Sequence, residues 1–268
     1  MSLVSNLFLI FVALSLLVYY IVPQKLQWVV LLVFSYIYYL AGGPRYVVFI
    51  LFSTLVTWLM AIFIEKTEEK GNHKGAKKLL ITGLILNFGM LGIVKYTNFT
   101  IENINALFHL HLRGIELLFP LGISFYTFQS SGYLLDVYWK RCKAEKQPFK
   151  YALFVSYFPQ ILQGPIGRYN RLANQLYEGH KFNGKNIVRG FERILWGFFK
   201  KMIIADWAAV FSDTIFNDPE TYSGVALIGV LLYSAQLYAD FSGGMDVVIG
   251  ISSMFGIELD ENFKRPYF

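Results

Sequence analysis

The sequence is poor in charge: only 16% of its 268 residues are Asp, Glu, Lys or Arg, whereas 55% are hydrophobic and the mean hydropathy is +0.45. A soluble domain needs about a quarter of its residues charged to cover its surface, so an ordinary soluble globule is excluded. The apolar residues gather in long runs, as in chains that cross a membrane several times. The single cysteine, Cys142, excludes an intrachain disulfide and leaves the compartment undetermined.

The sequence also lacks recognisable catalytic motifs. It has no Gly-x-Ser-x-Gly elbow, no phosphate-binding loop and no His-Glu-x-x-His pair. Its four histidines lie outside the apolar runs, and His109 and His111 would point the same way only in an extended strand, without a carboxylate or cysteine cluster to complete a metal site. We therefore expect no bound metal, and the residues alone give no complete catalytic constellation.

Long apolar runs are abundant, and we expect six of them to span a membrane. The first lacks the basic start and cleavage site of a secretory signal, so we interpret it as a retained helix. No internal repeat or linker interrupts the chain. The sequence predicts an all-α polytopic membrane protein in which residues 1–268 form a single multi-span domain. The expected spans are residues 3–22, 26–44, 46–64, 79–94, 117–135 and 221–239.

The net charge of +6 comes from basic clusters between these runs. Residues 65–78 and 140–150 are rich in lysine, and short loops of this kind stay in the cytoplasm. The N-terminus and the acidic turn at residues 217–220 are then expected outside. Such clusters favour contact with anionic lipid over nucleic-acid binding, and we expect no nucleic-acid partner.

Residues 151–167 carry no charge but contain two prolines, Gly164 and Gln163. Each proline removes a backbone donor, which is costly in hydrocarbon unless protein or water supplies partners. We expect a re-entrant or broken helix that lines a polar cavity, with Arg168 beside it. A kinked helix satisfied by its neighbours is the alternative.

Asp240 and Asp246 flank the pair Gly243-Gly244 in an apolar stretch. Carboxylates in a membrane segment are functional candidates by default. On a continuous helix, residues six apart are rotated by about 240°, which excludes a facing acid/base pair. The alternative is that Asp240 caps a helix opening at the glycines and that Asp246 lies at the membrane interface.

Residues 182–216 alternate basic and aromatic side chains, which is typical of a helix lying along the cytoplasmic interface. Lys200 and Lys201 are candidates for binding the phosphate of a donor. In the simpler interpretation, both lysines extend to the interface and bind no ligand.

Several blocks of the sequence resemble the bacterial membrane-bound O-acyltransferases of the alginate O-acetyltransferase type. They occur in the same order as in that family, and the resemblance extends over essentially all 268 residues. The blocks are Phe119-Pro120-Leu121-Gly122-Ile123-Ser124-Phe125-Tyr126-Thr127-Phe128-Gln129 followed by Tyr133-Leu134-Leu135-Asp136-Val137-Tyr138, then Phe158-Pro159-Gln160-Ile161-Leu162-Gln163-Gly164-Pro165-Ile166, Gly197-Phe198-Phe199-Lys200-Lys201-Met202-Ile203-Ile204-Ala205-Asp206 and Tyr238-Ala239-Asp240-Phe241-Ser242-Gly243.

The resemblance implies transfer of an acyl group, normally acetyl, from a thioester donor such as acetyl-CoA to hydroxyls of an exported polysaccharide or cell-surface glycan. It implies a multi-pass protein of the bacterial cytoplasmic (inner) membrane with no bound cofactor. It also allows for acyltransferase partners, in the periplasm or outside the cell, that act on the polysaccharide. The candidates for lining a tunnel across the membrane are Gln129, Gln163, Gly164, Pro165, Arg168, Tyr238, Asp240 and Ser242.

The family's essential histidine follows a stretch like residues 262–268, so the resemblance implies that it lies beyond Phe268 and that this chain corresponds to an N-terminal part. Residues 1–268 alone are then expected to be inactive. The alternatives are a multi-span transporter or channel, which also uses broken helices and buried carboxylates, and a non-catalytic truncated remnant.

Overall fold

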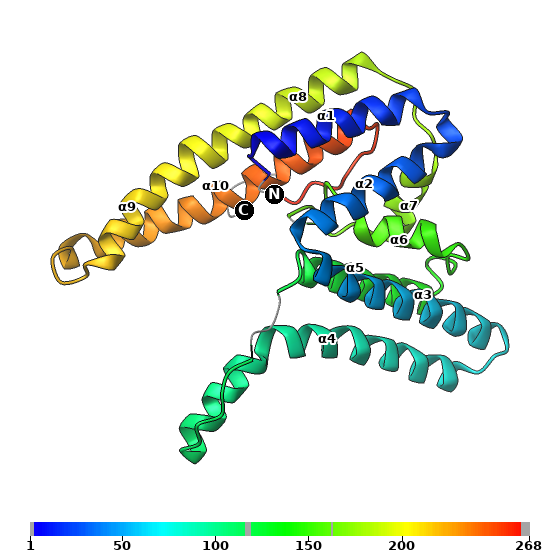
Figure 1. The fold of residues 1–268 in the computed structure, drawn as a ribbon, viewed down its shortest axis with the longest axis horizontal. Helices are drawn as coiled ribbons and strands as arrows, with labels where there is room; N and C mark the ends of the chain where they lie inside the picture. The colour runs from blue at the N-terminus through cyan, green and yellow to red at the C-terminus, as the bar shows by residue number, and fades with distance from the viewer. Residues whose placement is uncertain (1–2, 116–118, 162, 264–268) are drawn as a thin grey trace. The chain divides into compact units, whose positions relative to one another are not determined.

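A computed structural model describes residues 3–115, 119–161 and 163–263. Within these ranges the chain is helical and has no β-strand, which confirms the predicted all-α class (Figure 1). The helices are α1 (Asn6–Ile21), α2 (Gln27–Gly42), α3 (Val47–Glu69), α4 (His73–Phe108), α5 (Ile123–Tyr138), α6 (Pro148–Ser156), α7 (Tyr169–Tyr177), α8 (Gly184–Phe198), a π-helix (Phe199–Ala205), α9 (Asp206–Asn217) and α10 (Ala226–Met254).

Four helical stretches are long and apolar enough to cross a membrane, and the protein is therefore a multi-pass membrane protein. They are Gln24–Gly42, Pro44–Glu69, His73–Phe108 and Ser223–Met254, and each contains most or all of one expected span. The other two expected spans form shorter helices than predicted. Both α1 and α5 have 16 residues, about 24 Å, which is less than the hydrocarbon thickness.

The start of α5 explains its shortness. Gly122 has φ +67°, and a Cβ there would collide with the carbonyl oxygen of Ile161, so the chain turns sharply before the helix begins at Ile123. Leu117, where the span was expected to begin, lies outside the described residues.

The described residues cluster into two compact units, which we describe separately. The α2–α7 unit comprises residues 25–162 and 166–179, and the α1/α8–α10 unit comprises residues 1–24, 163–165 and 180–268. The single domain over residues 1–268 stays a prediction.

The α2–α7 unit is built around α3, α4 and α5, which pack on one another, while α6 packs against α2 and α3 (Figure 1). A buried amide joins two of these helices. Asn87 on α4 accepts from Ser53 Oγ at 2.6 Å and donates to Thr57 Oγ1 at 3.0 Å. Because hydrocarbon offers no other partner, this pairing satisfies polar groups and fixes the contact between α3 and α4.

Helix α4 continues to Phe108, although the expected span ended at Val94. Residues 95–108 contain neither glycine nor proline, so nothing in the sequence stops the helix. At 36 residues it is about 54 Å long and exceeds the hydrocarbon thickness. The chain then returns along it: Asn98 bonds both backbone groups of Ile115, and Asn105 bonds both those of Leu112, each at 2.9 Å.

In the α1/α8–α10 unit, α8, the π-helix and α9 form one continuous helical run beside α10 (Figure 1). Two glycines on each side bring α8 and α10 together. A Cβ on Gly197 would lie 2.6 Å from the Gly243 carbonyl oxygen, and one on Gly190 would lie 2.5 Å from that of Gly250. This approach of two backbones is open only to glycine.

Helix α10 runs unbroken from Ala226 to Met254, so the alternative in which it opens at Gly243-Gly244 with Asp240 as a cap is wrong. The physical reason is the packing on α8: Gly243 is part of the close helix contact, which compensates for its low helix propensity. The helical, amphipathic character expected for residues 182–216 is confirmed by α8, the π-helix and α9.

Candidate functional site

The break predicted in residues 151–167 is present in the structure. Helix α6 begins with Pro148 and ends at Ser156, residues 157–161 form a turn, and residues 163–168 have no helical structure before α7 starts at Tyr169. Side chains and turns satisfy part of the freed backbone: Phe158 N donates to Ser35 Oγ at 3.0 Å, and Gln160 N donates to Tyr157 O at 3.0 Å. Gly164 and Pro165 are buried. A non-helical backbone partnered by protein is the form that a membrane interior tolerates.

A cavity of about 220 Å³ lies in the α2–α7 unit between α5, the loop that follows it, and the start of α7. It brings together two residues predicted from the sequence, Gln129 and Arg168. The Gln129 side chain is buried, and its Nε2 donates to Phe154 O at 2.9 Å, which fixes the orientation of the amide. Arg168 is the exposed N-cap residue of α7, and the described part of the chain gives it no ion pair.

The cavity also contains a carboxylate and a second guanidinium. Asp136 is 7% exposed and lies 3.5 Å from Arg141 Nη1. Since this pair is neutral as a whole, Arg168 leaves the cavity with a net positive charge. The arrangement is suited to an anionic group such as a carboxylate or a phosphate, which guanidinium groups bind with two parallel hydrogen bonds.

Glu145 holds the wall of this cavity in place. Its carboxylate accepts from the Tyr169 hydroxyl at 2.7 Å, and its backbone N donates to the Tyr133 hydroxyl at 2.8 Å. Both tyrosines line the cavity. The Glu145 carbonyl accepts from Trp58 Nε1 on α3 at 2.9 Å. The loop between α5 and α6 is therefore tied to three helices.

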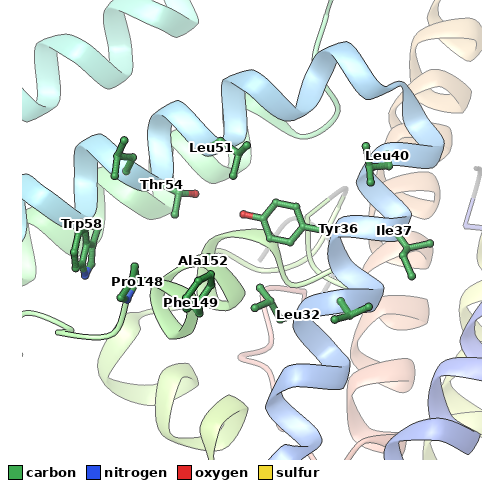
Figure 2. Close-up of a pocket in the computed structure, with 12 residues that line it drawn as sticks. Leu32, Tyr36, Ile37, Leu40, Leu51, Thr54, Trp58, Pro148, Phe149 and Ala152 are labelled. Carbon is green, nitrogen blue, oxygen red and sulfur yellow. The ribbon is translucent and has the colours of Figure 1, made fainter.

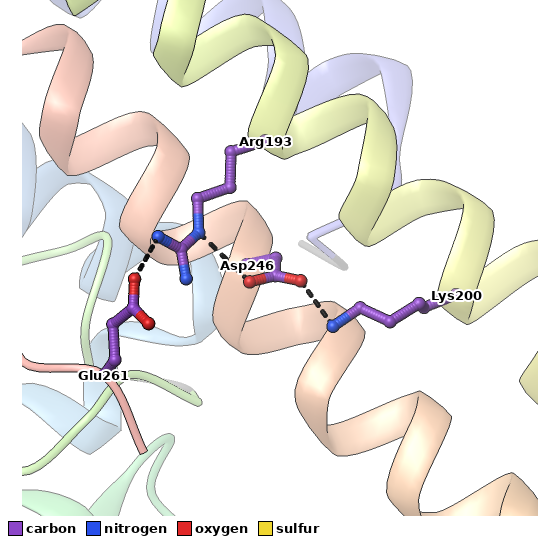
Figure 3. A network of polar contacts seen from close by, with 4 residues as sticks. All are labelled: Arg193, Lys200, Asp246 and Glu261. Carbon is purple, nitrogen blue, oxygen red and sulfur yellow. Dashed lines mark hydrogen bonds and ion pairs between the residues drawn. The ribbon is translucent and has the colours of Figure 1, made fainter. Parts of the chain in front are cut away.

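The charged residues of α10 face cations from the neighbouring helical run. Asp246 pairs with Lys200 and with Arg193 Nε, the latter at 3.1 Å, and Arg193 Nη1 also pairs with Glu261 at 2.7 Å (Figure 3). The side chains of Asp246 and Lys200 are only 12% and 14% exposed. The cluster contains two cations and two carboxylates, so its net charge is zero. Pairing of this kind offsets the cost of removing charged groups from water.

Lys201 pairs with two other carboxylates, Asp206 at 2.8 Å and Asp240 at 2.7 Å. Both lysines predicted to bind a donor phosphate thus face carboxylates in this structure. Phosphate binding by Lys200 and Lys201 stays a prediction, and it requires a phosphate to compete with these ion pairs. Asp240 and Asp246 bind different lysines, in agreement with the expectation that they do not act as a facing pair.

The remaining candidates also lie around α10, in the α1/α8–α10 unit. The Gln163 amide sits against Gly244, where any side chain would displace it. Ser242 is 1% exposed, and the described residues offer its hydroxyl no hydrogen-bond partner. The Tyr238 ring contacts Phe263 edge to face, with ring centroids 5.6 Å apart. The roles of all these residues in a tunnel stay predictions.

No protein-family model matches the chain, whereas comparison with individual proteins is informative. The chain is 36% identical over 270 residues to the probable alginate O-acetylase AlgI of Pseudomonas syringae pv. tomato, covering 98% of this chain and 51% of that protein. It is 34% identical over 268 residues to the peptidoglycan O-acetyltransferase of Helicobacter pylori, and the match covers 90% of this chain and 50% of that protein. The teichoic acid D-alanyltransferase of Bacillus subtilis is 29% identical over 158 residues, and the match covers 57% of this chain and 39% of that protein.

The chain belongs to the membrane-bound O-acyltransferase family. This confirms the resemblance found in the sequence blocks. The chain spans about half the length of the first two relatives. The position of the family's essential histidine beyond Phe268 stays a prediction, and residues 264–268 of the block that would precede it lie outside the described residues.

Sequence reasoning missed part of the candidate site. It singled out Asp246 but not its partners Arg193 and Glu261, and it overlooked Asp136 with Arg141. One signal was present: a carboxylate in an apolar helix needs a cation, and Arg193 and Lys200 are the basic residues on the buried side of the preceding amphipathic helix. Among the described residues no group of three or more His, Cys, Asp or Glu side chains lies close enough to hold a metal ion, and the expectation of no bound metal stays a prediction.

Proposed function

We propose that the protein is an O-acyltransferase that moves an acyl group, normally acetyl, from a thioester donor such as acetyl-CoA to hydroxyls of an exported polysaccharide or cell-surface glycan. The observation that carries this proposal is the similarity to alginate O-acetylases over 98% of the chain. The three relatives are named for different polymers, and each name describes the attachment of an acyl group to a polymer. We place the protein in the bacterial cytoplasmic membrane, where a cytoplasmic donor and an external acceptor can both reach it.

Acyl transfer requires a base near the acceptor hydroxyl and hydrogen-bond donors near the oxyanion that develops on the carbonyl. Within residues 1–268 we assign binding and positioning roles only. Gln129 and Arg168 face one polar cavity, where the guanidinium would attract an anionic part of donor or acceptor. Gln163, held against Gly244, belongs to the broken segment that we expect along the tunnel.

The test uses the complete gene product, expressed in a bacterium fed with ¹³C-acetate, and measures acetyl ester per sugar residue of the exported polymer by NMR. We expect Arg168→Gln to lower the ester content about tenfold or more, because it removes a charge-assisted contact of about 1.5–3 kcal/mol. Arg171→Gln, on the exposed face of the same helix, is the matched control and should retain the wild-type level.

Three further results decide the proposal. A wild-type strain whose polymers carry no labelled ester would contradict the acyltransferase function itself. If Arg168→Gln and Arg171→Gln behave alike while the wild type is active, the function stands and Arg168 is removed from the site. Gln163→Ala should abolish acylation while the protein still inserts into the membrane, and unchanged acylation would remove Gln163 as well.

A further inference from the structure

A second cavity of about 500 Å³ lies in the α2–α7 unit, and its lining residues are mostly apolar, unlike those of the polar cavity. It is a notch between α2, α3 and the first turn of α6, and we call it the lateral notch. Figure 2 shows Leu32, Tyr36 and Ile37 of α2 opposite Leu51, Thr54 and Trp58 of α3, with Phe149 of α6 at one end. Its volume falls within the range of small-molecule binding sites.

The walls of the lateral notch are large apolar side chains that the protein leaves open. Val33, Ile37, Leu51 and Leu55 are each about half exposed. Helices α2 and α3 both belong to stretches that can cross a membrane. At bilayer depth, a flexible acyl chain of a lipid is suited to fill an apolar space of this kind. If the notch were empty, the side chains that line it would lack the van der Waals contacts that such a chain supplies.

One end of the lateral notch lies against the loop between α5 and α6. Trp58 lines the notch, and its indole N–H donates to the backbone of Glu145 in the loop before α6. The loop of residues 140–150 is expected at the cytoplasmic interface, so this is the end of the notch nearer that interface. The notch thus runs from this interface toward Leu40, which lies at its other end in Figure 2.

The loop at this interface carries positive charge. Lys146 precedes the notch residue Pro148 by two positions, is exposed, and has no ion pair among the described residues. A cation at this height attracts the phosphate of a lipid whose tail lies in the notch. Among the described residues that line the notch, Tyr36 and Thr54 carry hydroxyls, and Figure 2 shows these two hydroxyls turned toward each other and not toward the apolar side chains.

We infer that the lateral notch is a binding site for one acyl chain of an anionic phospholipid, with the phosphate of that lipid at Lys146. This site is separate from the polar cavity, and the inference does not depend on the acyltransferase proposal. It assigns to α6 a second role: its first turn closes the notch at the level of the headgroups, while the broken segment follows its last turn.

The test places the purified protein in phosphatidylcholine vesicles that contain phosphatidylglycerol with a photoactivatable diazirine on one acyl chain. After illumination, mass spectrometry maps the crosslinked peptides. We expect crosslinks to concentrate on residues 32–40, 51–58 and 148–152. Leu55→Trp fills the notch and should abolish them, whereas Ile85→Trp, on an equally open face of α4, should leave them unchanged. Val33→Trp is a second filling variant, should Leu55→Trp fail to insert.

The headgroup part has its own measurement. Lys146→Gln should lower the preference for phosphatidylglycerol over phosphatidylcholine about fivefold, because one lysine near an anionic surface contributes about 1 kcal/mol. Crosslinks spread evenly over all lipid-facing helices would overturn the inference, since this is the pattern of unspecific surrounding lipid. A crosslink to a second copy of the protein at the notch would overturn it too.

Discussion

Asp246 illustrates how a single residue organises charge in an apolar setting. One of its carboxylate oxygens pairs with Arg193 and the other with Lys200, and Arg193 also pairs with Glu261 (Figure 3). Removing the carboxylate would leave two cations side by side with little water. The penalty arises mainly from these unpaired groups and only partly from the lost bond.

We therefore expect Asp246→Asn to destabilise the protein by about 2 kcal/mol, a value reduced from that of a fully buried pair because Arg193 is 31% exposed. The measurement is thermal unfolding in detergent. Asp213→Asn, on an exposed position of α9, is the control and should unfold like the wild type. Equal unfolding temperatures for both variants would show that the cluster contributes nothing to stability.

Cys142 is the second residue with a specific expectation. Burial, followed by the nearby carboxylates of Asp136 and Glu65, raises the pKa of its thiol to about 12. The thiolate is the reactive form, so at pH 8 the reactive fraction is about a thousandfold smaller than for an ordinary thiol. Labelling with a maleimide should be slow at pH 8 and should keep rising about tenfold per pH unit beyond pH 9. A rate that levels off near pH 9 would contradict the raised pKa.

At the scale of elements, the contact between α8 and α10 depends on glycines spaced by seven residues on each helix. Gly190 and Gly197 on α8 meet Gly250 and Gly243 on α10. Seven residues are close to two helical turns, so each pair of glycines lies on one face. This contact also sets the distance at which Lys200 and Lys201 reach the carboxylates of α10.

We expect Gly197→Ala to destabilise the protein by about 1–3 kcal/mol, because the added Cβ would lie 2.6 Å from the Gly243 carbonyl oxygen and the helices would have to separate. Gly89→Ala on α4 is the matched control, since a Cβ there meets no atom within 4 Å. The control should be neutral or stabilising by up to about 1 kcal/mol. Thermal unfolding distinguishes the two, and a stabilised Gly197→Ala protein would contradict the close contact.

At the scale of the whole molecule, the sequence predicts sidedness: the lysine-rich turn between α3 and α4 is cytoplasmic, and the turn after α9 is external. In a Cys142→Ser background, Asp218→Cys should react with a membrane-impermeant maleimide in intact cells. His73→Cys should react only after the membrane is opened. Both residues are exposed: His73 is the first residue of α4, and Asp218 directly follows α9. The reverse pattern would invert the orientation.

Much of the architecture follows from hydropathy, because length and apolarity alone decide which segments can cross a bilayer. Four of the six expected spans coincide with candidate spans, and the break in residues 151–167 follows from its prolines. The end of α4 was missed, and the sequence left open whether α10 is continuous. The apolar run ends at Val94, but residues 95–108 contain neither glycine nor proline, so the helix continues beyond that run. In α10, packing against α8 supports the glycine pair.

The candidate site was predicted less completely, because spacing along a chain does not reveal which distant helices meet. Gln129 and Arg168 were singled out separately, and only the fold places them at one cavity. The partners of Asp246 come from two segments, residues 193–200 and Glu261, on either side of α10 in the sequence. Pairing of this kind requires the packing of α8 against α10, which no local pattern specifies.

The π-helix at Phe199–Ala205 determines where the chain tolerates changes in length. Its hydrogen bonds span one residue more than those of an α-helix, so losing one residue there can be absorbed by reverting to ordinary helical geometry. Losing one residue between Gly190 and Gly197 would instead rotate one glycine by about 100° away from α10. Insertions and deletions among natural variants should therefore be tolerated within this seven-residue segment and absent from the helix before it.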